Sequence, residues 1–213
     1  MRVAPDRHQR ERAALLGEEL AGTCCSDRWS ACNHREPEKR QVCWSHLVSD
    51  FTAHAEGRAA QKAFGEAGLL ISERLFGAWH QFQNDGDRAA LKRQVARLQR
   101  QLRPLLEQAA RESAKTRYHR SFANNLPKIW PALSTFTTVP GVEPTNNAAE
   151  PGLRGAVSYR KLSLASQSAQ GKRTIERLLP ASKTCRLQHR SLFAYLTDLL
   201  TAKTRGDPMP LPI

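Results

Sequence analysis

Apolar residues recur at helical spacing through the middle of the chain, and this pattern predicts most of its elements. Residues 59–113 read as helical throughout apart from a turn at 84–87, where Asp87 should cap the second helix. In that helix the apolar side chains alternate at spacings of four and three, as in a helix packed along a hairpin or bundle seam. Pro104 should kink the helix or end its first half, because proline lacks an N–H and clashes with the preceding turn. The apolar positions are Leu91, Val95, Leu98, Leu102, Leu105 and Ala109.

Shorter helices are predicted on both sides of this region. One covers residues 13–20 and is closed by Gly22, and the other runs from residue 45 to about 55 and carries one apolar face. A longer helix should run from residue 168 to 188, and Ser191 should cap a last helix. Residues 157–164 are partly β-prone. A cluster of large apolar side chains between these helices predicts core positions at Ile129, Trp130, Leu133 and Phe136.

Two short apolar runs are typical of buried strands. The first covers residues 23–26 and is followed directly by Asp27, and the second covers residues 40–44. A carboxylate at the exit of a buried strand is a frequent active-site position in α/β sheets, although it is also a frequent helix cap. Taken alone, the residues favour the cap. The pattern as a whole predicts a mainly α protein with a small β remainder.

Charge adds a candidate partner. The chain has 33 Lys and Arg against 20 acidic residues, a formal net charge of +13. Such a surplus favours a polyanion, most simply nucleic acid, over a generic basic surface. The segment from residue 154 to 190 holds nine Lys or Arg residues and one acid. The candidate DNA-binding residues within it are Arg154, Arg160, Lys161, Lys172, Arg173 and Arg177.

Composition indicates the class of protein and the cellular compartment that we expect. A hydrophobic content of 40% in 213 residues is typical of a globular chain that buries a core. No apolar run reaches the length of a membrane span, and the amino terminus does not lead into a signal-peptide core. Five Cys residues without a paired framework fit a reducing compartment. We therefore expect a cytoplasmic protein without a membrane partner.

The stretch at residues 144–150 (PTNNAAE) is the strongest local motif. Thr145 is a candidate N-cap, which would place Asn146, Asn147 and Glu150 on the first turn of a helix. A carboxylate projecting from a rigid element suits a metal ligand. A plain helix start with a solvated Glu150 is the alternative, and spacing alone favours it.

Cys43 and His46 form a C-x-x-H pair. A zinc site would need two further ligands at plausible spacing, and none is evident nearby in the sequence. As a zinc half-site the pair is therefore weak.

Several stretches together resemble one protein family, in the same order along the chain. They are residues 22–31 (GTCCSDRWSA), 43–47 (CWSHL), 145–150 (TNNAAE), 160–163 (RKLS) and 167–168 (QS). From about residue 15 to 200 the chain resembles bacterial transposases of the insertion sequence sixty-six family. That family belongs to the DDE transposases, which have a ribonuclease-H-like catalytic core.

The resemblance implies roles for these residues. Asp27 would be the second acidic residue of the catalytic triad and Glu150 the third, and both would bind Mg²⁺ or Mn²⁺. Cys43 and His46 would support the core structurally. The partners would be DNA, as transposon ends and target, and a second copy or an intact transposase.

The resemblance also implies how the chain is organised. A partial ribonuclease-H-like core would cover residues 13–57, an all-helical insertion 58–138, and the carboxyl-terminal part of the core with its basic helices 139–203. Residues 1–12 and 204–213 are expected to be disordered ends.

The chain departs from the family pattern at several positions. The first catalytic Asp should precede Asp27 on a strand, and Asp6 lacks that apolar context. Pro151 and Gly152 follow Glu150 directly, so the metal-bearing helix should be short or displaced. Pro180 falls within the next predicted helix, with the same energetic cost, and Cys32 stands where an aromatic residue is usual.

These departures indicate a truncated transposase copy that is catalytically inactive alone. They also weaken the expectation that the chain binds Mg²⁺ or Mn²⁺. The alternative is a non-catalytic, basic, helical DNA-binding or interaction protein that pairs with an intact transposase.

Overall fold

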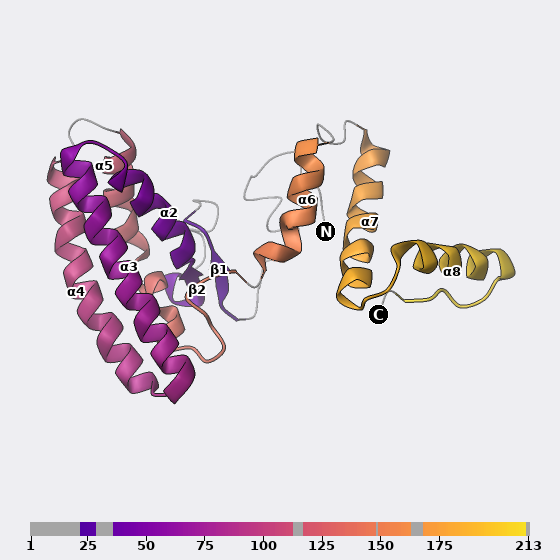
Figure 1. Cartoon of the computed structure of the whole chain (residues 1–213), viewed down its shortest axis with the longest axis horizontal. Helices are drawn as coiled ribbons and strands as arrows, with labels where there is room; N and C mark the ends of the chain where they lie inside the picture. The colour runs from indigo at the N-terminus through magenta and orange to yellow at the C-terminus, as the bar shows by residue number, and fades with distance from the viewer. Residues whose placement is uncertain (1–21, 29–35, 113–116, 148, 163–167, 212–213) are drawn as a thin grey trace. The chain divides into compact units, whose positions relative to one another are not determined.

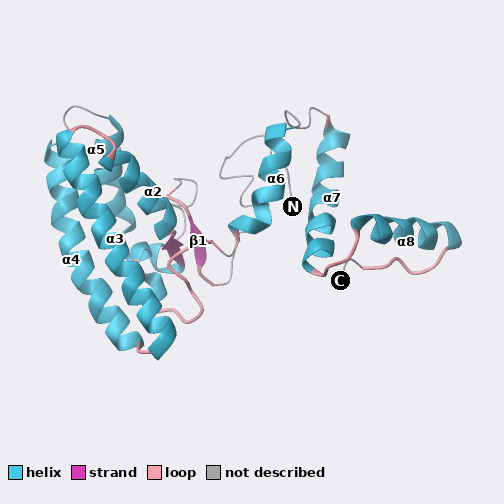
Figure 2. Ribbon diagram, in the orientation of Figure 1, coloured by secondary structure: helices cyan, strands magenta, loops and turns pink. Residues whose placement is uncertain are grey.

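The computed structural model describes residues 22–28, 36–112, 117–147, 149–162 and 168–211. Most of them are helical, as the sequence predicted, and two short strands form the only sheet in this described part (Figure 2). The chain divides into two compact units: Glu18–Asn147 forms one, and the helices that follow belong to the other. None of the helices among the described residues combines the length and the apolar character that a membrane span requires.

The two strands pair in parallel. Strand β1 (Cys24–Ser26) lies beside β2 (Arg40–Val42), with Cys24 opposite Arg40 and Ser26 opposite Val42. All three residues of β2 are buried, whereas those of β1 are half-buried. Both strands fall within the runs that the sequence predicted.

Four helices make up most of the first unit. They are α2 (Trp44–Ala55), α3 (Ala59–Asp85), α4 (Arg88–Glu112) and α5 (Arg117–Asn125). Figure 1 shows α3 and α4 running side by side as a long hairpin, with α2 against α3. Gly86 reverses the chain between α3 and α4 at a positive φ of 70°, and the Asp87 carboxylate caps α4 by accepting from Ala90 N–H at 2.9 Å. The predicted turn and cap are confirmed.

The core of this unit lies between these helices and the strands. Leu47 and Phe51 of α2, Leu75 of α3 and Leu102 of α4 are almost fully buried within it. The helical stripe predicted for α4 is confirmed at every position except Leu105, which is only half-buried. Beyond Pro104 the buried positions are Leu106 and the predicted Ala109. Pro104 does not end α4, which continues for two more turns. Packing along the hairpin is the physical reason, because tertiary burial routinely overrides local propensity.

A 3₁₀-helical segment closes the first unit over the sheet. It comprises η3 (Leu126–Leu133) and η4 (Thr135–Thr137), and the core positions predicted here are confirmed, with Trp130 half-buried. The Thr135 hydroxyl donates to the Arg40 carbonyl at 2.6 Å, and Phe136 N–H donates to Gln41 Oε1 at 2.9 Å. The segment thus holds the outer edge of β2 in place, as a neighbouring strand would do.

The described residues of the second unit form three helices: α6 (Glu150–Leu162), α7 (Ala169–Leu187) and α8 (Leu192–Arg205). Ser168 and Ser191 cap α7 and α8 through their side chains, as predicted for Ser191. Among its described residues, only Cys185, Tyr195 and Ala202 are buried apolar residues. Its helices therefore have a much smaller core than the first unit.

Two expectations for this unit were wrong. Residues 157–162 are helical rather than β-prone, and α6 is not short, because it covers thirteen residues. Pro151 lies in the first turn of α6, where backbone N–H groups have no intrahelical partner and proline is well tolerated. Pro180 is accommodated inside α7 without ending it.

Several predictions fall outside the described residues. They concern the disordered start at 1–12, the helix at 13–20, Asp6, Cys32 and residues 163–164. The five domain boundaries inferred from the resemblance stay predictions.

Two glycines allow α2 and α3 to pack closely. A Cβ on Gly68 would clash with the Phe51 ring, and a Cβ on Gly65 would clash with the backbone of Ala55. Gly77, in the same helix, has nothing within 4 Å of the place where its Cβ would stand. Only the first two positions therefore require glycine for packing.

We predict that Gly68→Ala lowers the free energy of unfolding by about 1–3 kcal/mol, because overpacking outweighs the better helix propensity of alanine. Gly77→Ala is the matched control in the same helix, and it should stabilise the protein by about 0.5–1 kcal/mol. Urea denaturation of both variants measures the difference. Equal effects at the two positions would contradict the packing described here.

Candidate catalytic site at the carboxyl ends of the strands

Asp27 directly follows β1, at the carboxyl end of the parallel pair. The residue as a whole is half-buried. Cys43 N–H donates to the Ser26 carbonyl at 2.8 Å, which continues the pairing of the strands to the level of Asp27. Because side chains alternate along a strand, Asp27 and Ser26 face opposite sides of the sheet.

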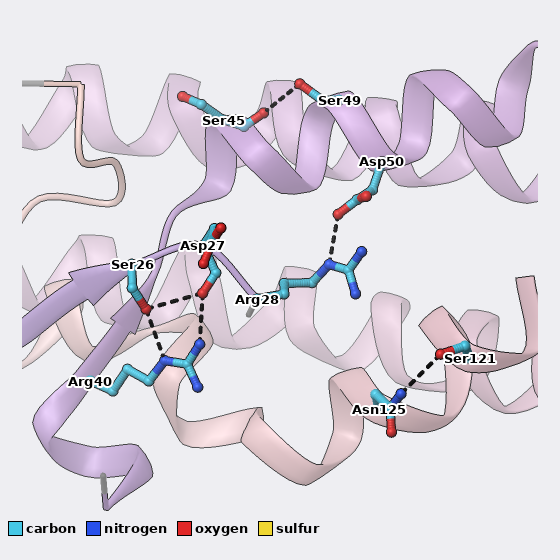
Figure 3. A network of polar contacts seen from close by, with 9 residues as sticks. All are labelled: Ser26, Asp27, Arg28, Arg40, Ser45, Ser49, Asp50, Ser121 and Asn125. Carbon is cyan, nitrogen blue, oxygen red and sulfur yellow. Dashed lines mark hydrogen bonds and ion pairs between the residues drawn. The ribbon is translucent and has the colours of Figure 1, made fainter. Parts of the chain in front are cut away.

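A buried arginine fixes the backbone at Asp27. Arg40 of β2 is only 1% exposed, and its Nε donates to Ser26 Oγ at 3.1 Å. Its Nη2 donates to the backbone carbonyl of Asp27 at 2.6 Å. In Figure 3 the guanidinium meets this carbonyl, and the Asp27 carboxylate points away from it. A buried guanidinium is strongly destabilising unless its N–H groups have hydrogen-bond acceptors. Burial of Arg40 therefore requires the end of β1 to keep this conformation.

The residue after Asp27 contacts the helices. Arg28 Nε lies 2.6 Å from Asp50 Oδ2 of α2, and both side chains are largely shielded from solvent. The Arg28 guanidinium also lies over the Phe122 ring of α5, 4.6 Å from its centroid. The Asp27 backbone is thus held on one side by β2 and on the other by α2 and α5.

Residues 144–147, at the other end of this unit in the sequence, also contact the amino-terminal end of α2. Trp44 N–H donates to the Pro144 carbonyl at 2.9 Å, and Ser45 Oγ donates to Asn147 Oδ1 at 3.1 Å. Asn146 N–H points at Cys43 Sγ, 3.4 Å away. Two consecutive amides, those of Cys43 and Trp44, therefore bind the Asp27 strand and the 144–147 segment respectively.

This contact corrects the sequence prediction for the motif. Thr145 does not cap a helix, and Asn146 and Asn147 do not lie on a first turn, because α6 begins only at Glu150. The polar groups of residues 144–147 instead satisfy the start of α2, whose first N–H groups lack intrahelical partners. A contact between segments about a hundred residues apart leaves no local sequence signal.

Glu150 begins α6 and lies three residues beyond Asn147 in the sequence. Its side chain lies outside the described residues, and α6 belongs to the second unit. The pairing of Asp27 with Glu150, and their roles in catalysis and metal binding, therefore stay predictions.

Cys25, on the strand that ends just before Asp27, is a protonated thiol at neutral pH. Burial, together with the nearby Cys43, Cys24 and Glu143, raises the pKa of Cys25 to about 12. A thiolate is the form of cysteine that attacks or binds metal, so the raised pKa makes Cys25 a poor nucleophile and a poor metal ligand at neutral pH. The sequence could not indicate this, since it depends on what surrounds the thiol.

Cys43 and His46 lie at the start of α2, with Cys43 fully buried. Within the described residues, no three His, Cys, Asp or Glu side chains gather in a way that could hold a metal ion. Cys43 serves as a contact for Asn146 N–H, so its buried sulfur faces the 144–147 segment. A structural role for the pair stays a prediction.

The candidate DNA-binding residues all lie on the second unit. Arg154, Arg160 and Lys161 are exposed on α6, and Arg173 and Arg177 are exposed on α7. Lys172 is half-buried. The helices of this unit therefore present many cations to solvent without a large core beneath them.

Comparison with known proteins agrees with these motifs. The family described as "Transposase IS66 family" matches residues 1–174, which is most of the chain. The match includes Asp27, the strands, the helical hairpin and the 144–150 motif. No curated protein and no solved structure gave a significant match. The chain therefore belongs to the IS66 family of transposases.

Proposed function

We propose that this chain acts in DNA transposition, with Asp27 and Glu150 as two metal-binding carboxylates of a strand-cleavage and strand-transfer site. One observation carries the proposal: neighbouring amides at the start of α2 bind both the strand that ends at Asp27 and the segment that leads to Glu150. Asp27 is the second acidic residue of the site and Glu150 the third. The sheet and the start of α2 would be part of a ribonuclease-H-like core.

The chemistry of these groups suits Mg²⁺ or Mn²⁺. Both ions prefer hard oxygen ligands, and the Asp27 carboxylate points away from the buried cation of Arg40 (Figure 3). When bound, such ions activate a water or a DNA 3′-hydroxyl and stabilise the leaving oxygen at a scissile phosphate. The contribution of this chain is to hold the Asp27 backbone through Arg40 and to hold the approach to Glu150 through Trp44 and Ser45.

Two carboxylates leave the site one short of the family triad. In these 213 residues the only Asp before Asp27 is Asp6, whose surroundings do not resemble a strand. We therefore propose that the 213-residue chain binds metal weakly and does not cleave DNA unless a further carboxylate is supplied.

The basic helices provide the DNA contact in this proposal. Phosphate contacts from Lys and Arg give affinity for any sequence, and the segment from residue 154 to 190 carries nine such residues. The same observation supports the second candidate, a DNA-binding protein without catalysis that pairs with an intact transposase. Exposed apolar side chains such as Leu162 and Phe193, which are 85% and 81% exposed, would suit a protein partner.

Metal binding tests the catalytic proposal. Calorimetric titration with Mn²⁺ should give one site in the wild type, weaker binding in Asp27→Ala and in Glu150→Ala, and none in the double variant, because each substitution removes a hard oxygen ligand. Glu66→Ala with Glu73→Ala, which removes two exposed carboxylates of α3, is the matched control and should bind as the wild type does. Unchanged binding in the Asp27 and Glu150 double variant would refute the site and leave the second candidate.

DNA binding tests the basic helices. In Arg173→Ala with Arg177→Ala, the slope of log affinity against log salt should fall by about 2, since each phosphate contact contributes roughly one counterion. Arg93→Ala with Arg97→Ala removes two exposed cations at the same spacing on α4, and its slope should stay unchanged. Equal losses in both variants, measured by fluorescence anisotropy on one duplex, would show that only total charge matters.

A further inference from the structure

Two arginine side chains, those of Arg40 and Arg28, anchor the three consecutive residues 26–28 around Asp27. Arg40 binds the Ser26 hydroxyl and the Asp27 carbonyl from the buried face of the sheet. Arg28 extends its own side chain in the other direction, to Asp50 of α2 (Figure 3). The carbonyl side of the Asp27 peptide is therefore tied to β2, and the residue after it is tied to the helices.

The helical end of this connection is rigid. Phe122, which lies beneath the Arg28 guanidinium, is almost fully buried. Its ring packs edge-on against Phe51 of α2 and Phe64 of α3, with centroids 5.3 and 5.9 Å away. Asp50 precedes Phe51 in α2, so both contacts of Arg28 are built on one aromatic cluster.

The geometry suits an ion pair that fixes position. The Arg28 and Asp50 side chains are 24% and 17% exposed, so water screens the pair less than a surface pair. The aromatic face below the guanidinium adds a second contact that restricts its orientation. Side chains held by both kinds of contact lose little further freedom when a ligand binds, which is the condition for a preorganised site.

We propose that Arg28 is a positioning residue for Asp27. Through its contacts with Asp50 and Phe122, Arg28 anchors the chain directly after Asp27 to the packed helices α2, α3 and α5 and so restricts the movement of the Asp27 carboxylate. This inference rests on the proposed role of Asp27 as a metal ligand. In this proposal the helices α2, α3 and α5 hold Arg28 in place, besides connecting the Asp27 motif with the 144–150 motif in the sequence. Arg40 fixes the strand itself, whereas Arg28 fixes the exit from it.

Amide hydrogen exchange tests the proposal without any metal. Cys43 N–H donates to the Ser26 carbonyl, whereas the next amide, Trp44 N–H, donates to the Pro144 carbonyl. In Arg28→Ala and in Asp50→Asn, exchange at Cys43 should become about tenfold faster while exchange at Trp44 stays the same, since only the end of β1 is released. NMR resolves the two neighbouring amides.

Arg190→Ala provides the matched control. Arg190 lies 2.7 Å from the Asp198 carboxylate and 5.2 Å from the Tyr195 ring centroid, so it makes the same two kinds of contact in the second unit. Exchange at Cys43 should be unchanged in this variant. If Arg28→Ala leaves Cys43 exchange unchanged, or speeds Cys43 and Trp44 equally, the proposal is overturned, because Arg28 would then contribute nothing or only general stability.

Mn²⁺ affinity separates this proposal from the proposed function. Arg28→Ala should weaken Mn²⁺ binding about tenfold, as loss of groups that orient a metal ligand commonly does, and Arg28→Lys should restore only part of it. If Asp27→Ala does not affect Mn²⁺ binding, the proposed function fails, and the exchange rates alone decide the role of Arg28. Unchanged affinity in Arg28→Ala, in a protein whose Asp27 does bind the ion, would contradict the positioning role.

Discussion

Two neighbouring amides at the start of α2 hold the candidate site together. The first N–H groups of a helix have no partners within it, and here those positions are used to join distant segments. Cys43 N–H binds the end of β1, and Trp44 N–H binds Pro144, about a hundred residues later. The indole N–H of Trp44 also donates to the Leu133 carbonyl at 2.8 Å, so the same residue fixes the 3₁₀ segment. Disturbing this helix start would weaken the contacts of three segments: the end of β1, residues 144–147 and the 3₁₀ segment.

Buried and paired charged groups then fix the backbone around Asp27. Arg40 is a buried cation whose N–H groups are directed at the backbone around Asp27, away from the carboxylate. Arg28 is paired with Asp50 and packed on Phe122. The Cys25 thiol keeps its proton at neutral pH. Asp27 is therefore surrounded by groups that fix its backbone, and Cys25, in the strand that ends just before Asp27, is a poor ligand for a hard cation.

The sequence predicted the regular elements well where periodicity was long. Helices α3 and α4, the turn with its Asp87 cap and the serine cap of α8 follow from local spacing and side-chain chemistry. Local rules failed where tertiary packing decides: α4 continues past Pro104, and the buried position shifts from Leu105 to Leu106. They also failed at Thr145, because the partners of residues 144–147 lie at the other end of the unit. Motif resemblance identified the family, and only the fold could identify Arg40, Trp44 and Asp50 as supports of the site.

The central claim is that Asp27 and Glu150 bind one metal ion together, and paramagnetic NMR tests it most directly. Mn²⁺ broadens the signals of nearby amides, so a single site predicts that amides around residues 27 and 150 broaden together at the lowest Mn²⁺ concentration. In Asp27→Asn the broadening should weaken at both places together and require a higher Mn²⁺ concentration, because both depend on one ion. Broadening that is confined to one of the two places, or that weakens at residue 27 and not at residue 150 in Asp27→Asn, would contradict the account.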